Sequence, residues 1–208
     1  MEDKKAYIFA SGDVSDYDYI ASRISNNGLV LCADGGLEHC LKCGISPDVV
    51  IGDMDSYVGE VDEDILIKFP VEKDDTDTSL CIKYAIEKGY KDIEIFGALG
   101  GRIDHSLANV QLLLYCKEKG VSCILSDKRE TAFIVRNECI KKLIGKERTV
   151  SIFSISVKSD NITLKGLKYS LENADLYCNF PLGVSNTSIC DEIEVSVGDG
   201  TLLVVISQ

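Results

Sequence analysis

The sequence predicts a mixed α/β protein with an α/β part followed by an all-β part. Up to about residue 126, short apolar runs alternate with stretches of helical period, which favours a mostly parallel sheet covered on both faces. Beyond that point the runs are short and β-rich, with Gly, Asn and Asp turns between them, as in a sandwich. We therefore expect two domains, residues 1–126 and 127–208.

The elements of the first part follow from apolar runs and the signals that stop them. Strands are expected over residues 5–10, 29–33, 48–52, 64–69, 92–96 and 121–125. Helices are expected over residues 17–26, 36–43, 78–88 and 108–119, each stopped by a nearby glycine. The stretch 97–106 is expected to be a glycine-rich loop. In the second part, the strand-like runs are TAFIV, TVSIFSISV, ITLKGL, EIEVSV and TLLVVIS.

Composition excludes several classes of protein. The net charge of −12, from 22 basic and 34 acidic residues, argues against non-specific nucleic-acid binding. No apolar run approaches the roughly 20 residues of a membrane span, and the N-terminal stretch does not resemble a signal peptide. An odd number of cysteines, nine, without a secretory signal predicts reduced thiols and a cytoplasmic location.

One cysteine pair has metal-ligand spacing. Cys40-x-x-Cys43, beside His39, is either half of a zinc or redox site or a pair of packed helix cysteines. Because no second CxxC completes a site, we favour packing.

The stretch VVIGDMDS, residues 49–56, places two aspartates directly after a run of β-branched residues. Carboxylates just past the carboxyl end of a strand lie where α/β proteins bind ligands. Asp53 and Asp55 would repel each other unless a cation lies between them, and a divalent metal is the usual solution. A solvated acidic loop is the alternative.

Four polar loops follow apolar strands and, in a parallel sheet, would share one edge. They are ADGG (33–36), GDMDS (52–56), KDDTD (73–77) and GGRIDH (100–105). So many carboxylates need a compensating charge, and Mg²⁺ usually binds one or two carboxylates together with substrate phosphates. Asp53, Asp55 and Asp77 are the smallest set of carboxylates that would bind the ion, and Asp74 would assist them.

Glycines in two of these loops suit a phosphate ligand. Gly35 and Gly36 open one helix, and the pair Gly100–Gly101 precedes another, so the backbone can approach a phosphate closely. Arg102 would hold phosphate oxygens in bidentate fashion, or would make a surface salt bridge. We expect His105 to cap or pack. The GxxxxGK[ST] and GxGxxG nucleotide signatures are absent.

The ordered motifs ADGG (33–36), PDVVIGDMDS (47–56), KDDTDT (73–78), GALGGRIDH (97–105) and SNTS (185–188) resemble the thiamine pyrophosphokinase family. The resemblance covers nearly the whole chain. It implies transfer of a diphosphate from ATP to the hydroxyl of thiamine. It also implies a Rossmann-like α/β domain, a β-sandwich that contributes to thiamine binding and dimerisation, and a homodimer with active sites at the interface.

The resemblance also assigns roles to residues. Asp53, Asp55 and Asp77 would coordinate Mg²⁺ on the ATP phosphates. The nucleotide and transfer site would be lined by Asp34, Gly35, Gly36, Lys73, Asp74, Gly100, Gly101, Arg102 and Asp104. The thiamine pyrimidine would be held by Ser185, Asn186 and Thr187, from the partner subunit. One departure is that animal members have a Trp near thiamine and this chain has none; without the resemblance, residues 185–188 would be a turn.

The implied catalytic residues are Asp77, Asp104 and Arg102. Either carboxylate would accept the proton of the thiamine hydroxyl, and Asp104 is slightly favoured because a metal ligand is a poor base. Two alternatives remain open. The D-x-D-x-S stretch also resembles the nucleophile loop of aspartyl-phosphate phosphatases, in which Asp53 would be phosphorylated. A non-catalytic nucleotide or metal sensor on the same fold is the other.

Overall fold

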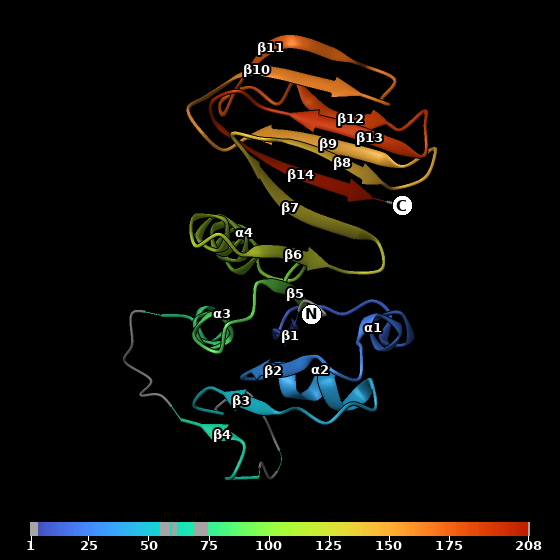
Figure 1. Cartoon of the computed structure of the whole chain (residues 1–208). Coiled ribbons are helices and arrows are strands. Elements are labelled where there is room, and N and C mark those ends of the chain that lie inside the picture. Colours follow the sequence, from blue (N-terminus) through green and yellow to red (C-terminus); the bar gives the residue numbers. More distant parts are fainter. Residues whose placement is uncertain (1–3, 55–58, 60–61, 69–74, 208) are drawn as a thin grey trace. The chain divides into compact units, whose positions relative to one another are not determined.

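The structure is a computed structural model that describes residues 4–54, 59, 62–68 and 75–207 (Figure 1). The chain forms two compact units, Met1–Lys128 and Arg129–Gln208. It is a mixed α/β protein in which all described helices belong to the first unit. None of the described helices is long and apolar enough to span a membrane.

The first unit contains a sheet of parallel strands. These are β1 (Lys5–Phe9), β2 (Leu29–Ala33), β3 (Val49–Ile51), β4 (Leu66–Ile67), β5 (Asp92–Phe96) and β6 (Ser122–Ser126). They lie side by side in the order β6-β5-β1-β2-β3-β4, and each neighbouring pair is parallel. The carboxyl ends of these strands therefore lie at one edge of the sheet, where the sequence analysis expects the polar loops to meet.

Helices cover both faces of this sheet. They are α1 (Tyr17–Arg23), α2 (Gly36–Lys42), α3 (Asp77–Glu87) and α4 (Ile103–Glu118). Figure 1 shows α1 and α2 on one side of the strands and α3 and α4 on the other. On the first side, Ile20 of α1 and Leu37 of α2 join a core with Phe9, Cys32 and Phe96. Consecutive residues of β1, β2 and β5 are buried on both faces of the sheet, as is usual in parallel sheets.

Helix α1 ends three residues earlier than the sequence predicts. Ile24 is extended, with φ −88° and ψ 123°. The next residue, Ser25, exchanges hydrogen bonds with Tyr7: its N–H donates to the Tyr7 Oη at 3.1 Å, and the phenol lies 3.2 Å from the Ser25 Oγ. This tertiary contact ends the helix where local propensity would have continued it.

Helix α4 begins at Ile103, five residues before the predicted start. The prediction of a loop through residue 106 was therefore wrong for its last four residues. Gly97, Gly100 and Gly101 all have positive φ and confine the loop to the glycine-rich segment. Beyond Arg102 no residue breaks a helix, and Asp104 in the first turn suits the helix dipole.

The second unit is built from antiparallel strands. They are β7 (Glu130–Arg136), β8 (Cys139–Leu143), β9 (Thr149–Ser154), β10 (Lys158–Lys165), β11 (Leu171–Tyr177), β12 (Gly183–Thr187), β13 (Glu192–Ser196) and β14 (Thr201–Ser207). Two groups pair in the orders β12-β9-β14-β7 and β11-β10-β13-β8. The sequence analysis missed β8, β11 and β12, because these strands bury few side chains and lack a marked apolar pattern.

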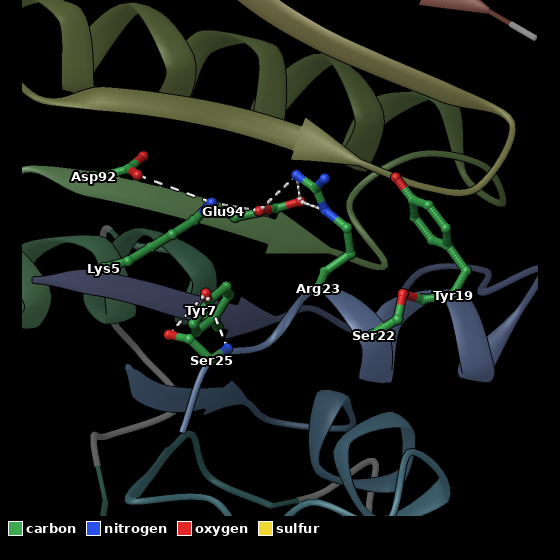
Figure 2. Close-up of polar contacts among 8 residues, drawn as sticks. All are labelled: Lys5, Tyr7, Tyr19, Ser22, Arg23, Ser25, Asp92 and Glu94. Carbon is green, nitrogen blue, oxygen red and sulfur yellow. Dashed lines mark hydrogen bonds and ion pairs between the residues drawn. The ribbon is translucent and has the colours of Figure 1, made fainter. Parts of the chain in front are cut away.

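A carboxylate lies buried in the parallel sheet. Glu94 on β5 has no exposed side-chain surface, and two cations neutralise it (Figure 2). The Lys5 Nζ lies 2.7 Å from its Oε2, and Arg23 donates through Nε at 2.9 Å and Nη2 at 3.1 Å. The network joins β1, β5 and the end of α1, because a buried charge is tolerated only when it is paired.

We predict that Glu94→Gln destabilises the protein by about 3 kcal/mol, since it leaves the half-buried Arg23 without its anion and Lys5 with only Asp92, at 3.9 Å. The cost lies at the low end for a buried pair because 39% of the Arg23 side chain and 24% of the Lys5 side chain reach solvent. Urea unfolding of the full chain measures it. The exposed Glu87→Gln is the matched control and should change stability by less than about 0.5 kcal/mol; equal effects of the two substitutions would contradict the role of the network.

Candidate functional site

Main-chain contacts bind the loops at the carboxyl edge of the first unit to one another. The Asp34 N–H donates to the Ile51 carbonyl at 2.9 Å, which holds the loop after β2 against the end of β3. The Gly12 N–H donates to the Gly97 carbonyl at 2.8 Å, which holds the loop after β1 against the loop after β5. The structure thus brings together three of the predicted polar loops and adds the loop after β1.

Glycine is required where these backbones touch. A Cβ on Gly36 would lie 2.0 Å from the Phe9 carbonyl oxygen, so the first turn of α2 rests directly on the end of β1. Likewise, a Cβ on Gly12 would lie 2.5 Å from the Gly97 carbonyl oxygen. Gly97 also has a φ of +62°, which favours glycine on its own. An added side chain would therefore force these main-chain segments apart.

Asp34 occupies a strained position in this edge. Its φ is +47°, and its neighbour Gly52 leaves it little room, because a Cβ there would lie 3.1 Å from the Asp34 Cα. The Asp34 Oδ1 is buried and has no hydrogen-bond partner among the described residues. A strained residue with an unsatisfied buried oxygen is typical of a ligand site.

The acidic residues differ in their surroundings. Asp53 follows Gly52 and is partly buried; Asp77 is the first residue of α3 and is also partly buried. Asp75 is neutralised by the Lys83 Nζ at 2.7 and 2.8 Å and accepts from the Ser79 Oγ at 3.0 Å. Asp55, Lys73 and Asp74 lie outside the described residues. Within the described ranges, no group of three His, Cys, Asp or Glu could hold a metal ion.

Arg102 and Asp104 form a bidentate ion pair at the start of α4. Arg102 donates through Nε to Oδ1 at 3.1 Å and through Nη2 to Oδ2 at 2.5 Å. The hydrogen bond from Arg102 is the main reason that the pKa of Asp104 is lowered, and it makes this carboxylate a weaker proton acceptor. Both side chains are largely exposed, 74% and 61%. His105 is exposed, and its N–H donates to the Asp104 Oδ1.

The SNTS motif of the second unit is a strand, so the alternative of a turn was wrong. Gly183–Thr187 pairs with β9, with an irregularity at Ser185, which has a φ of +58°. Asn186 is buried, and its side-chain amide is bonded at both ends to the backbone of Tyr169, at 2.7 and 3.0 Å. Ser185 is exposed and Thr187 partly buried.

Sequence reasoning missed two residues that the structure places beside the predicted motifs. Asp13 lies against Gly100, where an added Cβ would be 3.3 Å from the Asp13 Cβ. Tyr169, held by Asn186, exposes 64% of its surface next to the SNTS strand. The position of Asp13 just past β1 was a usable signal, whereas the placement of Tyr169 depends on tertiary contacts.

The favoured prediction for the cysteine pair is confirmed. Cys40 is buried in the core beside β2, and Cys43 packs against that core. All nine cysteines are free thiols. Burial raises the pKa of the Cys43 thiol to about 11, so it is protonated at neutral pH.

Comparison with known proteins matches both units to one family. The family described as "Thiamin pyrophosphokinase, catalytic domain" matches residues 20–125, and "Thiamin pyrophosphokinase, vitamin B1 binding domain" matches residues 137–202. The chain belongs to the thiamine pyrophosphokinase family. The resemblance inferred from the five motifs is therefore confirmed.

Individual members of the thiamine pyrophosphokinase family support the assignment over the full length. The thiamine pyrophosphokinase of Bacillus subtilis (strain 168) is 31% identical, over 97% of this chain and 98% of the relative. Thiamine pyrophosphokinase 2 of Arabidopsis thaliana is 27% identical over 86% of this chain and 78% of its own. The solved structure of the Bacillus subtilis enzyme superposes with a TM-score of 0.88, at 27% identity and 99% coverage of both chains.

We predict that Gly36→Ala disrupts this edge. Because its Cβ would collide with the Phe9 carbonyl, α2 must shift, at a cost of about 1–3 kcal/mol and with loss of ATP affinity. Thermal unfolding and calorimetric titration with ATP measure the two effects. Gly120→Ala is the control: it has a φ of +69° but no atom within 4 Å, so it should cost about 1 kcal/mol and leave ATP affinity unchanged. Unaltered ATP binding in Gly36→Ala would contradict the role of this contact.

Proposed function

We propose that this chain transfers a diphosphate group from ATP to the hydroxyl of thiamine at the carboxyl edge of the parallel sheet. The family match over both units carries the proposal, and ATP-dependent diphosphate transfer to thiamine is the reaction of that family. The unsatisfied Asp34 oxygen and the glycine-opened loops support a polar ligand at this edge.

We infer that Asp53, Asp55 and Asp77 hold Mg²⁺ on the ATP phosphates. Their hard oxygen donors suit this ion, which takes one or two carboxylates plus phosphate oxygens rather than an all-protein cage. That preference is compatible with the lack of a complete ligand cluster among the described residues, which exclude Asp55. The ion would offset the negative charge of the phosphates.

The nucleotide is proposed to lie along the glycine loops. Its ligands would be Asp34, Gly35, Gly36, Lys73, Asp74, Gly100, Gly101 and Arg102. The phosphates would meet the start of α4, where the helix dipole favours an anion and where the exposed Arg102 guanidinium could exchange Asp104 for phosphate oxygens.

In the transfer step, the thiamine oxygen forms a bond to the β-phosphorus while the bond to the α,β-bridging oxygen breaks and AMP leaves. Asp104 or Asp77 takes the hydroxyl proton. The ion pair suggests how Asp104 would become a better acceptor: when Arg102 turns to the phosphates, the main cause of the lowered Asp104 pKa is removed, while the hydrogen bond from the His105 N–H remains. The remaining acceleration of the transfer step would come from positioning the two substrates and from neutralising the phosphate charge.

Thiamine is proposed to bind through Ser185, Asn186 and Thr187 of the second unit. The family description of residues 137–202 as a vitamin B1 binding domain supports this placement. Because the Asn186 amide is bonded to the Tyr169 backbone, we assign it to shaping the strand, with exposed Ser185 and the Tyr169 ring facing the ligand. An aromatic ring can take the place of the absent Trp by stacking on a cationic heterocycle.

We also propose that residues 1–126 form a Rossmann-like domain, that residues 127–208 form a β-sandwich, and that the enzyme is a cytoplasmic homodimer with active sites at the interface. Parallel strand pairing supports the Rossmann-like domain, and buried residues on β9, β10, β13 and β14 support the β-sandwich.

Exposed apolar side chains support the homodimer. They are Ile103 and Leu107 beside the transfer site, and Phe180, Leu182 and Ile189 near β12.

The comparisons do not support the two alternatives. The family match favours a diphosphate-transferring enzyme over a phosphatase that uses Asp53 and over a non-catalytic sensor. The reactions also differ in product: the proposed reaction releases AMP, whereas a phosphatase would release inorganic phosphate through a phosphorylated Asp53.

We predict that phosphorus NMR of the protein with ATP, Mg²⁺ and thiamine shows AMP and thiamine diphosphate in equal amounts. Asp53→Asn and Asp77→Asn should each lower turnover by at least about 100-fold, because they remove charge from the phosphate site. Asp64→Asn, an exposed carboxylate in the β3–β4 connection, is the control and should retain turnover. Release of ADP or phosphate in place of AMP would refute the reaction, and active Asp53→Asn and Asp77→Asn variants would refute the metal assignment.

Removal of the metal should weaken ATP binding without changing the fold. With EDTA in excess, we predict at least about a ten-fold loss of ATP affinity by calorimetry, since the acidic edge then repels the phosphates. Circular dichroism should remain unchanged. ATP binding of equal strength with and without Mg²⁺ would contradict the assignment.

A further inference from the structure

A buried asparagine on α4 contacts the glycine-rich loop that precedes this helix. The Asn109 Nδ2 donates to the Ala98 carbonyl at 2.9 Å, and only 8% of Asn109 is exposed. The amide nitrogen must face this oxygen, because a carbonyl only accepts hydrogen bonds. Asn109 begins the buried stripe of α4 that Leu113 and Cys116 continue, where an apolar side chain is expected. A buried amide is tolerated there because it is bonded to the loop.

The loop depends on contacts of this kind, because its own main chain does not fix its shape. Residues 97–102, all of which the structure describes, bend without the hydrogen bonds of a turn. Bonds from outside hold the first two carbonyls of the loop. The Gly12 N–H donates to the Gly97 carbonyl at 2.8 Å, and Asn109 donates to the Ala98 carbonyl.

The bond from Asn109 orients the peptide group that joins Ala98 to Leu99. In a planar trans peptide, the N–H points opposite to the C=O. Because the Ala98 carbonyl faces the Asn109 amide, the Leu99 N–H faces away from it. Leu99 is partly exposed and the two glycines that follow are exposed, so this main chain borders solvent.

A second side chain of α4 acts on the same loop. The Ser106 Oγ donates to the Gly100 carbonyl at 3.4 Å, a long hydrogen bond. By the same geometry, the N–H of the next residue, Gly101, points away from Ser106. Two peptide groups of the loop are thus oriented by side chains of the helix that follows it.

We propose that Asn109 is a positioning residue for the ATP phosphates. By holding the Ala98 carbonyl, it turns the Leu99 N–H toward the phosphates, and main-chain N–H groups bind such anions well. Asn109 itself does not touch the nucleotide. This inference rests on the proposed function, because the neighbouring Gly100 and Gly101 are assigned there to the nucleotide.

Amide NMR of the ¹⁵N-labelled full chain with Mg²⁺ and α,β-methylene-ATP tests this placement. The analogue is not turned over, because a carbon replaces the oxygen of the bond that would break. A hydrogen bond to a phosphate deshields an amide proton, so the Leu99 resonance of wild type should move downfield. The Gly120 amide, just past the other end of α4, is the control and should not move. An unmoved Leu99 amide in wild type that binds the analogue would overturn the proposal.

Asn109→Leu removes the donor and roughly keeps the volume. At pH 7.5 it should bind the analogue about five-fold more weakly than wild type in calorimetry, as expected when a buried carbonyl loses its donor. The KM for ATP should rise with it, whereas the KM for thiamine should stay within about two-fold, because thiamine is assigned to the second unit. A merely structural role would not separate the two KM values.

Tyr7→Phe is the matched control. Tyr7 is also buried in the first unit, and its hydroxyl accepts from the Ser25 N–H at 3.1 Å, away from the loop. This substitution should lower the Tm and leave the affinity for the analogue unchanged. Equal losses of affinity in Tyr7→Phe and Asn109→Leu would overturn the proposal.

Asn109→Ser decides if Asn109→Leu does not fold, because its hydroxyl is too short to reach the Ala98 carbonyl and it should lose the same affinity. Wild-type affinity in either folded variant would overturn the inference and leave the function standing. Wild type that binds the analogue with a shifted Leu99 amide but makes no AMP with thiamine would refute the function and leave the inference standing. If wild type binds no analogue, the inference falls whether or not AMP forms.

Discussion

The carboxyl edge of the first unit depends on one steric constraint, the contact of main chain with main chain around the end of β1. The first turn of α2 lies on the Phe9 carbonyl, and the loop after β1 lies on Gly97. A methyl group added at Gly36 or at Gly12 would push the two main-chain segments apart. Three loops are therefore held together at one edge through main-chain contacts. An edge of this kind suits phosphates, which bind well to main-chain donors.

The carboxylates inside the sheet and those at its edge differ in how fully they are paired. Within the sheet, Glu94 is matched at once by Arg23 and Lys5, so the buried carboxylate is fully compensated (Figure 2). At the edge, Asp75 has Lys83 and Asp104 has Arg102, but one oxygen of Asp34 is buried without a partner among the described residues. Compensation that is complete in the core and incomplete at the edge is the pattern expected when the remaining positive charge comes with the substrate.

The second unit was harder to predict for a physical reason. Strands β7, β9 and β14 bury side chains along their length and stand out as apolar runs. Strands β11 and β12 are mostly exposed, so their sequences, LENADLY and GVSNT, carry polar residues that also suit turns. The placement of β12 depends on pairing with β9 and on the Asn186 amide, which replaces main-chain pairing to Tyr169. Single-sequence patterns do not contain such contacts.

The sequence by itself determined the alternation of strands and helices up to residue 126, the carboxylate motifs at strand ends and the family, because these depend on local period and on short ordered motifs. Only the tertiary structure decided where α1 ends and where α4 begins, since α1 ends where Ser25 contacts Tyr7 and α4 begins directly after the positive-φ glycines. It alone showed that Asp104 is paired with Arg102, that the Asn186 amide is bonded to the Tyr169 backbone, and that the His39 ring contacts Tyr17. These are contacts between segments far apart in the chain, and no local preference encodes them.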